Sequence, residues 1–366
     1  AWIRPRFAVV QTTTAGVAFL HLVIWTTSCL RPEMLGSALA VYLVFGALHA
    51  LWPVVSERLR PGETNKTMRL TGMWAAPIIV ALMALPVIVL PHVSFVLWPA
   101  VLLADLLAIG LALAGGAVLP VLASLVITLL VATAWLFRVP AEAASLPPIL
   151  LVVVFFALLF ATAGWWLGKR PNQSAAQFSI GALQLDAGKL LPAASGCMPF
   201  ALLILMVLQL PVGNPTPVFG AGLLLVILLL GLTLIPRTTA LAPVAAICCL
   251  ALEGVWHSTR FNPELPGTPL AWYLGFYALF TVFPFVFRKL RNDHTEPWIA
   301  SSLAGIGHFL LVHDLVRHAW PNGMMGLLPA AFAVPSVLSL LAVLRTAKTM
   351  DRATQVRLSW LGGVAL

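Results

Sequence analysis

The sequence predicts an all-α, polytopic transmembrane helical bundle of about 13 spans, built from parallel four-helix repeats. The first observation is composition: of 366 residues, 61% are apolar and only 9% are charged, and the mean hydropathy is +0.99. Soluble domains carry about 25% charged residues, because a water-facing surface has to be polar. The second observation is a series of apolar runs of membrane-spanning length, and the third is a residue pattern that recurs three times.

A bilayer core about 30 Å thick is crossed by a helix of about 20 apolar residues. The runs are continuously apolar, whereas strands of a membrane barrel alternate every second residue, so we expect helices. The last span is incomplete. The predicted spans are 7–27, 34–55, 69–90, 95–114, 117–137, 147–168, 190–210, 216–234, 238–257, 269–288, 297–318, 323–344 and 354–366.

The recurring pattern is a Trp, a Phe twenty positions later, then Ala-Leu, and an Arg fifteen positions after the Phe. Three occurrences in one frame indicate copies of one unit, and an even number of spans per copy makes them parallel repeats. We expect 1–33 to hold the last helix of a preceding repeat, which suggests the interior of a longer protein. Residues 34–137, 138–257 and 258–366 are then three repeats. The pattern residues are Trp25, Phe45, Ala47, Leu48 and Arg60; Trp135, Phe155, Ala157, Leu158 and Arg170; and Trp256, Phe276, Ala278, Leu279 and Arg291.

The basic residues indicate the orientation. Let side X be the side of the membrane on which the first helix starts. Seventeen of the twenty-one Lys and Arg residues then lie in loops on side X. Side X is then the cytoplasm by the positive-inside rule, and Arg60, Arg170 and Arg291 are cytoplasmic anchors. The recurring tryptophans fall at the opposite face, where indoles favour the headgroup boundary. Because the net charge of +9 is scattered in short loops, we expect the lipid bilayer and other membrane-protein subunits as partners, and no nucleic acid.

Ionisable groups inside spans are the first place to look for function. Asp105, near the middle of 95–114, is either a proton or cation site or a neutral acid hydrogen-bonded to a neighbouring helix. Glu253 and His257 are four residues apart and share a helical face, so they could bind metal, shuttle protons or form an interfacial ion pair. Single histidines such as His21 and His49 are expected to be structural.

The span 297–318 is the richest in polar residues. Asp314 and His318 are neighbours on it, His308 lies more than a turn deeper, and His313 points elsewhere. A metal site needs at least three convergent ligands, and this helix supplies two. The cysteines show no metal spacing, and Cys248 and Cys249 are expected to act as small hydrophobes. We therefore predict no metal, no cofactor and no catalytic residue.

The recurring Phe-x-Ala-Leu…Arg pattern, the stacked short apolar helices and the stretch 102–113 resemble the bacterial membrane-protein family called domain of unknown function 2339. The resemblance covers essentially the whole chain. It implies a bacterial protein, which we expect in the cytoplasmic (inner) membrane, and the basic residues predict that the chain starts on the cytoplasmic side. It also implies a cytoplasmic coiled segment before the helices, no known reaction and no catalytic residues.

The leading hypothesis is a structural or accessory subunit of a membrane assembly, because the repeats share no polar constellation. The first alternative is a transporter with a polar cavity near Asp105 and helix 297–318. The second is a membrane enzyme that acts on a lipid-linked or redox substrate. An enzyme is disfavoured by the lack of a Gly-rich phosphate loop, a GxSxG elbow or an HExxH motif.

Overall fold

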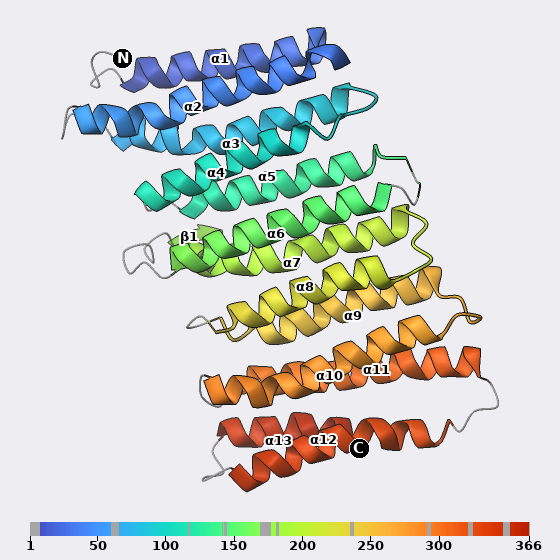
Figure 1. Cartoon of the computed structure of the whole chain (residues 1–366). Helices are drawn as coiled ribbons and strands as arrows, with labels where there is room; N and C mark the ends of the chain where they lie inside the picture. The colour runs from blue at the N-terminus through green and yellow to red at the C-terminus, as the bar shows by residue number, and fades with distance from the viewer. Residues whose placement is uncertain are drawn as a thin grey trace. The chain divides into compact units, whose positions relative to one another are not determined.

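The computed structural model describes residues 8–59, 66–115, 118–140, 142, 145–168, 177–180, 183–234, 238–290, 294–320, 325–346 and 352–365. Over these ranges the chain forms thirteen α-helices, which confirms the predicted all-α fold (Figure 1). Every predicted span has its helix, with ends within four residues of those expected. The helices are α1 Ala8–Cys29, α2 Leu35–Leu59, α3 Lys66–Val89, α4 Leu97–Gly115, α5 Val118–Leu136, α6 Leu146–Gly168, α7 Ala187–Gln209, α8 Thr216–Leu232, α9 Leu241–Arg260, α10 Gly267–Leu290, α11 Glu296–Ala319, α12 Leu327–Thr346 and α13 Arg352–Ala365.

Ten helices in the described ranges are long and apolar enough to cross a membrane, so the chain is a multi-pass membrane protein. They are α2 to α7 and α9 to α12. α8, with 17 residues, lies at the short limit of about 17–25 residues for a membrane-spanning helix, and α13 has 14 residues. α1, α8 and α13 stay predicted spans.

Two short elements accompany the helices. The 3-10 helix η2, Pro32–Met34, leads directly into α2. The strands β1, Gln177–Ile180, and β2, Leu183–Asp186, form an antiparallel hairpin in which Phe178 is opposite Leu185. The hairpin precedes α7 and lies in the polar loop where the predicted middle repeat is longer than the others. Its ladder pairs backbone groups that an irregular loop would leave to water.

The chain divides into two compact units, and the division runs through α6 and α7. Unit 1 comprises Ala1–Pro140 and Leu158–Ser195, and unit 2 comprises Ala141–Ala157 and Gly196–Leu366. In unit 1, α3 packs against α1, α2, α4 and α5. In unit 2, α11 packs in the same way against α9, α10, α12 and α13. Each of these two helices is therefore the centre of its unit.

Small residues allow this close packing. α11 buries Ala300, Ala304 and Gly305, and a Cβ added to Gly307 would collide with Leu250 of α9. Without a driving force from water, helices in a bilayer associate through such close contacts.

The helices of the two units correspond in position as well as in packing. The bounds of α1 to α5, shifted by the 231 residues that separate Trp25 from Trp256, match those of α9 to α13 within three residues. A duplicated unit predicts this correspondence, although the boundaries of the repeats stay a prediction. The anchors Arg60, Arg170 and Arg291 lie outside the described residues.

The recurring tryptophans differ from the expectation. Trp135 and Trp256 are buried, and only Trp25 is partly exposed. Trp256 donates from Nε1 to the carbonyl oxygen of Val212 at 2.9 Å, and Trp135 packs edge-on against Trp98 with ring centroids 5.1 Å apart. The headgroup interpretation is therefore wrong for the two buried indoles, which fix loop and helix packing instead.

Candidate functional site

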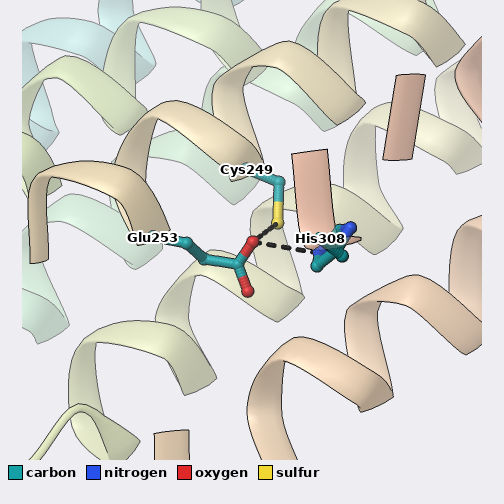
Figure 2. A group of neighbouring side chains, drawn as sticks. All are labelled: Cys249, Glu253 and His308. Carbon is teal, nitrogen blue, oxygen red and sulfur yellow. Dashed lines mark hydrogen bonds and ion pairs between the residues drawn. The ribbon is translucent and has the colours of Figure 1, made fainter. Parts of the chain in front are cut away.

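Polar side chains of unit 2 gather where α9 packs against α11. Cys249 and Glu253 are one turn apart on α9, and His308 lies at the middle of α11. The thiol sulfur, a carboxylate oxygen and an imidazole nitrogen all lie within 4.8 Å of one another. In Figure 2 the cysteine and the histidine point toward the same carboxylate oxygen. We call these three residues the core cluster.

The distances within the core cluster are short and its residues are buried. His308 Nε2 is 3.0 Å from Glu253 Oε2, and the Cys249 Sγ donates to the same oxygen over 3.7 Å. Glu253 and His308 are 0% exposed, and Cys249 is 1% exposed. A buried charge is tolerated only when it is paired, so an ionised Glu253 requires a proton or another cation at this site.

The backbone fixes the tautomer of His308. Its Nδ1 is 2.7 Å from the carbonyl oxygen of Ala304, and because a carbonyl only accepts, Nδ1 carries the proton. The Nε2 of a neutral ring then presents a lone pair to Glu253 Oε2, and no hydrogen bond joins the two atoms. The second carboxylate oxygen, Oε1, has no hydrogen-bond partner. Two lone pairs 3.0 Å apart repel unless a cation lies between them, so the core cluster is arranged to hold a proton or a metal ion.

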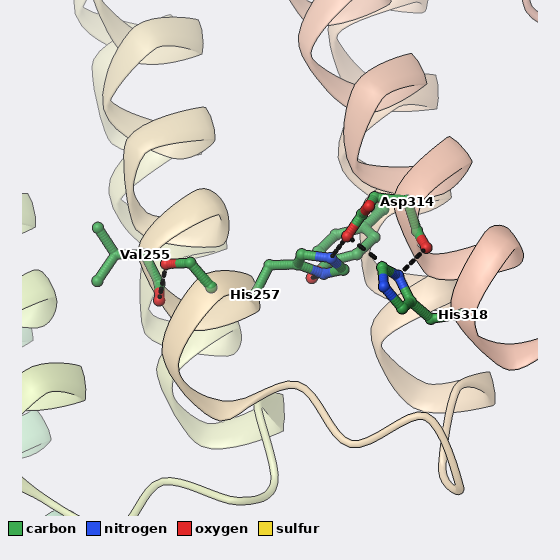
Figure 3. A network of polar contacts seen from close by, with 6 residues as sticks. Val255, His257, Asp314 and His318 are labelled. Carbon is green, nitrogen blue, oxygen red and sulfur yellow. Dashed lines mark hydrogen bonds and ion pairs between the residues drawn. The ribbon is translucent and has the colours of Figure 1, made fainter.

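A second polar group lies toward the ends of α9 and α11 (Figure 3). His257 Nε2 is 2.9 Å from Asp314 Oδ2, and its Nδ1 is 3.0 Å from the Tyr273 hydroxyl. His318 Nδ1 donates to the Asp314 carbonyl oxygen at 2.8 Å and lies 3.4 Å from Oδ2. The side chains of Asp314 and His318 are 46% and 54% exposed, whereas that of His257 is 9% exposed. We call these four residues the outer group.

The outer group leads toward the core cluster. Tyr273 is 0% exposed and hydrogen-bonded to His257. Glu253 and His257 are also one turn apart on α9. Polar side chains therefore follow one another from the half-exposed His318 to the buried His308.

These positions correct part of the sequence prediction. The predicted pairing of Glu253 with His257 is wrong, because Glu253 contacts Cys249 and His308 while His257 contacts Tyr273 and Asp314. Glu253 is buried rather than interfacial. The contact between Asp314 and His318 is confirmed, and so is the deeper position of His308.

The core cluster was not predicted from the sequence, because its three residues lie on two helices and the sequence shows the ligands of one helix at a time. Cys249 was expected to be a small hydrophobe, and it lies 59 positions before His308. Only the helix pairing of α9 with α11 brings them together. The available signal was the four-residue spacing of Cys249 and Glu253, which places both on one face.

Asp105 lies in unit 1, between α4 and α5. It is 0% exposed and accepts a hydrogen bond from Thr128 Oγ1 at 2.8 Å, while its other oxygen has no hydrogen-bond partner. This is the predicted alternative of an acid bonded to a neighbouring helix. A pocket of about 310 Å³ in unit 1 does not include Asp105; it is lined by Ala50, Pro53, Val54, Glu57, Arg58, Arg69, Met73, Leu111, Ala114 and Gly115.

Of the two histidines that were predicted to be structural, only His49 has buried surroundings. His49 is buried, and its Nδ1 donates to the carbonyl oxygen of Phe45 at 2.8 Å. His21 is exposed on α1.

Positions 231 residues earlier in the chain show which polar contacts of unit 2 have a counterpart in unit 1. The hydrogen bond between His257 and Tyr273 has a counterpart in the buried hydrogen bond between Thr26 and Tyr42. The core cluster has no such counterpart, because the matching positions of the α1 and α3 pair are Ala18, Leu22 and Pro77. Since that pair packs without a polar cluster, the core cluster is not required for packing.

Comparisons with models of known protein families, with curated proteins and with solved structures gave no match for this chain. The resemblance to the family called domain of unknown function 2339 therefore stays a prediction. What the chain does has to be argued from the geometry between α9 and α11.

Proposed function

We propose that this chain is a multi-pass protein of the bacterial cytoplasmic membrane that moves a cation through the α9 and α11 pair. The chain starts on the cytoplasmic side, as the positive-inside rule predicts. One observation carries the proposal: a buried carboxylate oxygen of Glu253 lies 3.0 Å from an imidazole nitrogen of His308 between two membrane-spanning helices. Intramembrane ionisable groups of this kind mark ion and proton pathways.

The outer group supplies the access side. In the predicted orientation, α9 and α11 both end at the extracytoplasmic face, where Asp314 and His318 are half-exposed. A cation attracted by the Asp314 carboxylate passes His257 and Tyr273 before it meets Glu253. The polar route of the transporter hypothesis therefore belongs to helix 297–318 and not to Asp105.

Flux through reconstituted protein tests the proposal. The chain is placed in liposomes that contain a pH-sensitive or metal-sensitive dye, with valinomycin to clamp the potential. We expect proton or divalent-metal flux above that of empty liposomes, and its loss in Glu253→Gln and His308→Asn. The matched controls, the exposed Glu264→Gln and the α11 variant His313→Asn, keep the flux. Wild-type flux no greater than that of empty liposomes for either cation would contradict the proposal.

A structural or accessory subunit of a membrane assembly is the second candidate. Two features of unit 1 favour it. The buried Asp105 accepts a hydrogen bond from Thr128, and the α1 and α3 pair has apolar residues at the positions that correspond to the core cluster. Such a subunit co-purifies from native membranes with a partner at fixed stoichiometry, and mass spectrometry of the purified assembly tests this. A membrane enzyme has less support, because the core cluster is fully buried and offers no surface to a lipid-linked substrate.

A further inference from the structure

We infer that Cys249, Glu253 and His308 form a binding site for a divalent transition metal ion of the zinc type. The inference rests on the proposed function, since it names the cation that the α9 and α11 pair holds. A thiolate, an imidazole and a carboxylate are the three ligand types that zinc prefers. They come from two helices that are packed against each other, so the site is formed by the fold itself.

The spacing of the ligand atoms fits a tetrahedral ion. With metal–ligand bonds of about 2.0–2.3 Å, neighbouring ligands of such an ion lie about 3.4–3.7 Å apart. Glu253 Oε2 is 3.0 Å from His308 Nε2 and 3.7 Å from Cys249 Sγ, and no pair of ligand atoms exceeds 4.8 Å. The two shorter distances differ from this spacing by a few tenths of an ångström, and binding of an ion would also close the third distance, between Cys249 Sγ and His308 Nε2, by up to about 1 Å.

The surroundings of His308 match those of a metal ligand. A ligating imidazole usually donates its other N–H to a backbone carbonyl or a carboxylate, which orients the ring. His308 does this through Nδ1 to Ala304. The partnerless Oε1 of Glu253 is a further acceptor beside the ion.

Charge balance favours a divalent ion. A thiolate and a carboxylate contribute two negative charges, a neutral imidazole contributes none, and a divalent ion makes the site neutral. Without metal, the thiol keeps its proton and one proton is shared by Glu253 and His308, which is also neutral overall. One divalent ion therefore replaces two protons, which leave toward solvent, and no net charge is buried in either state.

The ligand set also indicates which ions are rejected. Magnesium and calcium require six or more oxygen ligands, and the core cluster offers a sulfur and a nitrogen. Three protein ligands leave a fourth position of the ion open, as in sites that exchange a ligand rather than in closed structural sites. An exchangeable ion is what a transport route requires.

Cobalt provides a direct optical test. The full chain is purified in detergent, stripped with a chelator and titrated with Co²⁺ alone. We expect one bound Co²⁺ per chain, with the visible bands of a tetrahedral ion and a thiolate-to-cobalt charge-transfer band that Zn²⁺ abolishes. Cys249→Ser should remove the charge-transfer band, and His308→Asn should weaken binding by more than about 100-fold, because loss of an outer-shell partner alone costs 10–100-fold.

The neighbouring cysteine is the matched control. Cys248 faces α7, where it is hydrogen-bonded to Cys197, so Cys248→Ser removes a thiol without removing a ligand. It should leave the cobalt spectrum unchanged. Elution volume on size exclusion and the thermal midpoint show that each variant is folded. Two results would overturn the inference. One is that the wild-type chain does not bind one Co²⁺ per chain. The other is that the charge-transfer band survives Cys249→Ser and disappears in Cys248→Ser.

Failure of the inference is distinguishable from failure of the proposed function. Tight Co²⁺ binding without flux of any cation keeps the metal site and rejects transport. Proton flux that depends on Glu253 but is accompanied by no metal binding keeps transport and rejects the metal site.

Discussion

Arg138, just beyond the end of α5, donates from Nη2 to the carbonyl oxygen of Ile88 in the last turn of α3 at 2.8 Å. Arg260, at the end of α9, makes the corresponding contacts with α7, donating to Val207 and Leu208 at 3.1 Å each. The last carbonyls of a helix lack intrahelical partners and carry a partial negative charge. Arg138 and Arg260, two of the four basic residues that the sequence predicts for the extracytoplasmic side, therefore cap the ends of neighbouring helices.

Loss of the cap should weaken unit 2 measurably. Arg260→Gln is expected to lower the free energy of unfolding by about 1–2 kcal/mol, because two carbonyls lose a charged donor. Arg31→Gln, which removes the same charge on the same predicted face, is the control. Unfolding in mixed micelles measures both. An equal effect of the two substitutions would show that net charge, and not the cap, determines the loss.

The buried acid and base should be coupled energetically. Glu253→Met or His308→Leu alone leaves an unpaired polar group in the core and should cost about 3–5 kcal/mol. The double variant replaces the pair with apolar groups and should be close to wild type in stability. A double-mutant cycle in mixed micelles measures the coupling. Additive losses would show that the two side chains do not act as a pair.

The distance between α9 and α11 should determine the Co²⁺ affinity of the core cluster and the cation flux. Gly307→Ala places a methyl group against Leu250 and should cost about 1–3 kcal/mol, while it reduces Co²⁺ affinity and flux. Gly254→Ala, on α9 with nothing within 4 Å of the added carbon, is the matched control. Cobalt titration and thermal unfolding check both. Unchanged affinity in Gly307→Ala would mean that the core cluster does not depend on this helix spacing.

Asp105 should contribute to the stability of the protein and not to cation flux. Thr128→Val keeps the shape of the side chain but removes the donor to a buried carboxyl, and should cost about 1–3 kcal/mol. Flux and Co²⁺ binding should stay at wild-type values. Ser124→Ala, one turn away on α5, loses a buried hydroxyl that has no hydrogen-bond partner and should cost little. Loss of flux in Thr128→Val would contradict this prediction and would show that Asp105 takes part in transport.

Asp314 should affect the rate of metal binding more than its equilibrium. In Asp314→Asn the half-exposed negative charge is lost, and association of Co²⁺ with the core cluster should slow by about tenfold. The affinity should fall by less, because the three ligands are unchanged. Stopped-flow absorbance measures the rate, with the exposed Glu264→Gln as control. An unchanged association rate would show that the ion reaches Glu253 by another route.

Much of the fold was predictable because each helix is encoded locally. A continuous apolar run of bilayer length predicts its own helix, and the recurring Trp and Phe positions align the helices of the two units. The number of spans follows less directly from composition, since α8 and α13 have only 17 and 14 residues and stay predicted spans.

The candidate site was less predictable because it depends on helix contacts. Asp314 and His318 are on one helix and were paired correctly, whereas Glu253 finds its partner on another helix. A sequence spacing shows which residues share a face, but not which helix that face meets. For the same reason Cys249 could not be distinguished from Cys248, although the two thiols face different helices.

The apolar counterparts of the core cluster suggest an order of events in the history of the chain. If the units arose by duplication, Ala18, Leu22 and Pro77 show that the helix pair is compatible with an inert seam. The reactive trio was then acquired by, or kept in, one copy while the other remained a passive scaffold. The same comparison offers an engineering route, since three substitutions in α1 and α3 would place the same three side chains at the corresponding sequence positions.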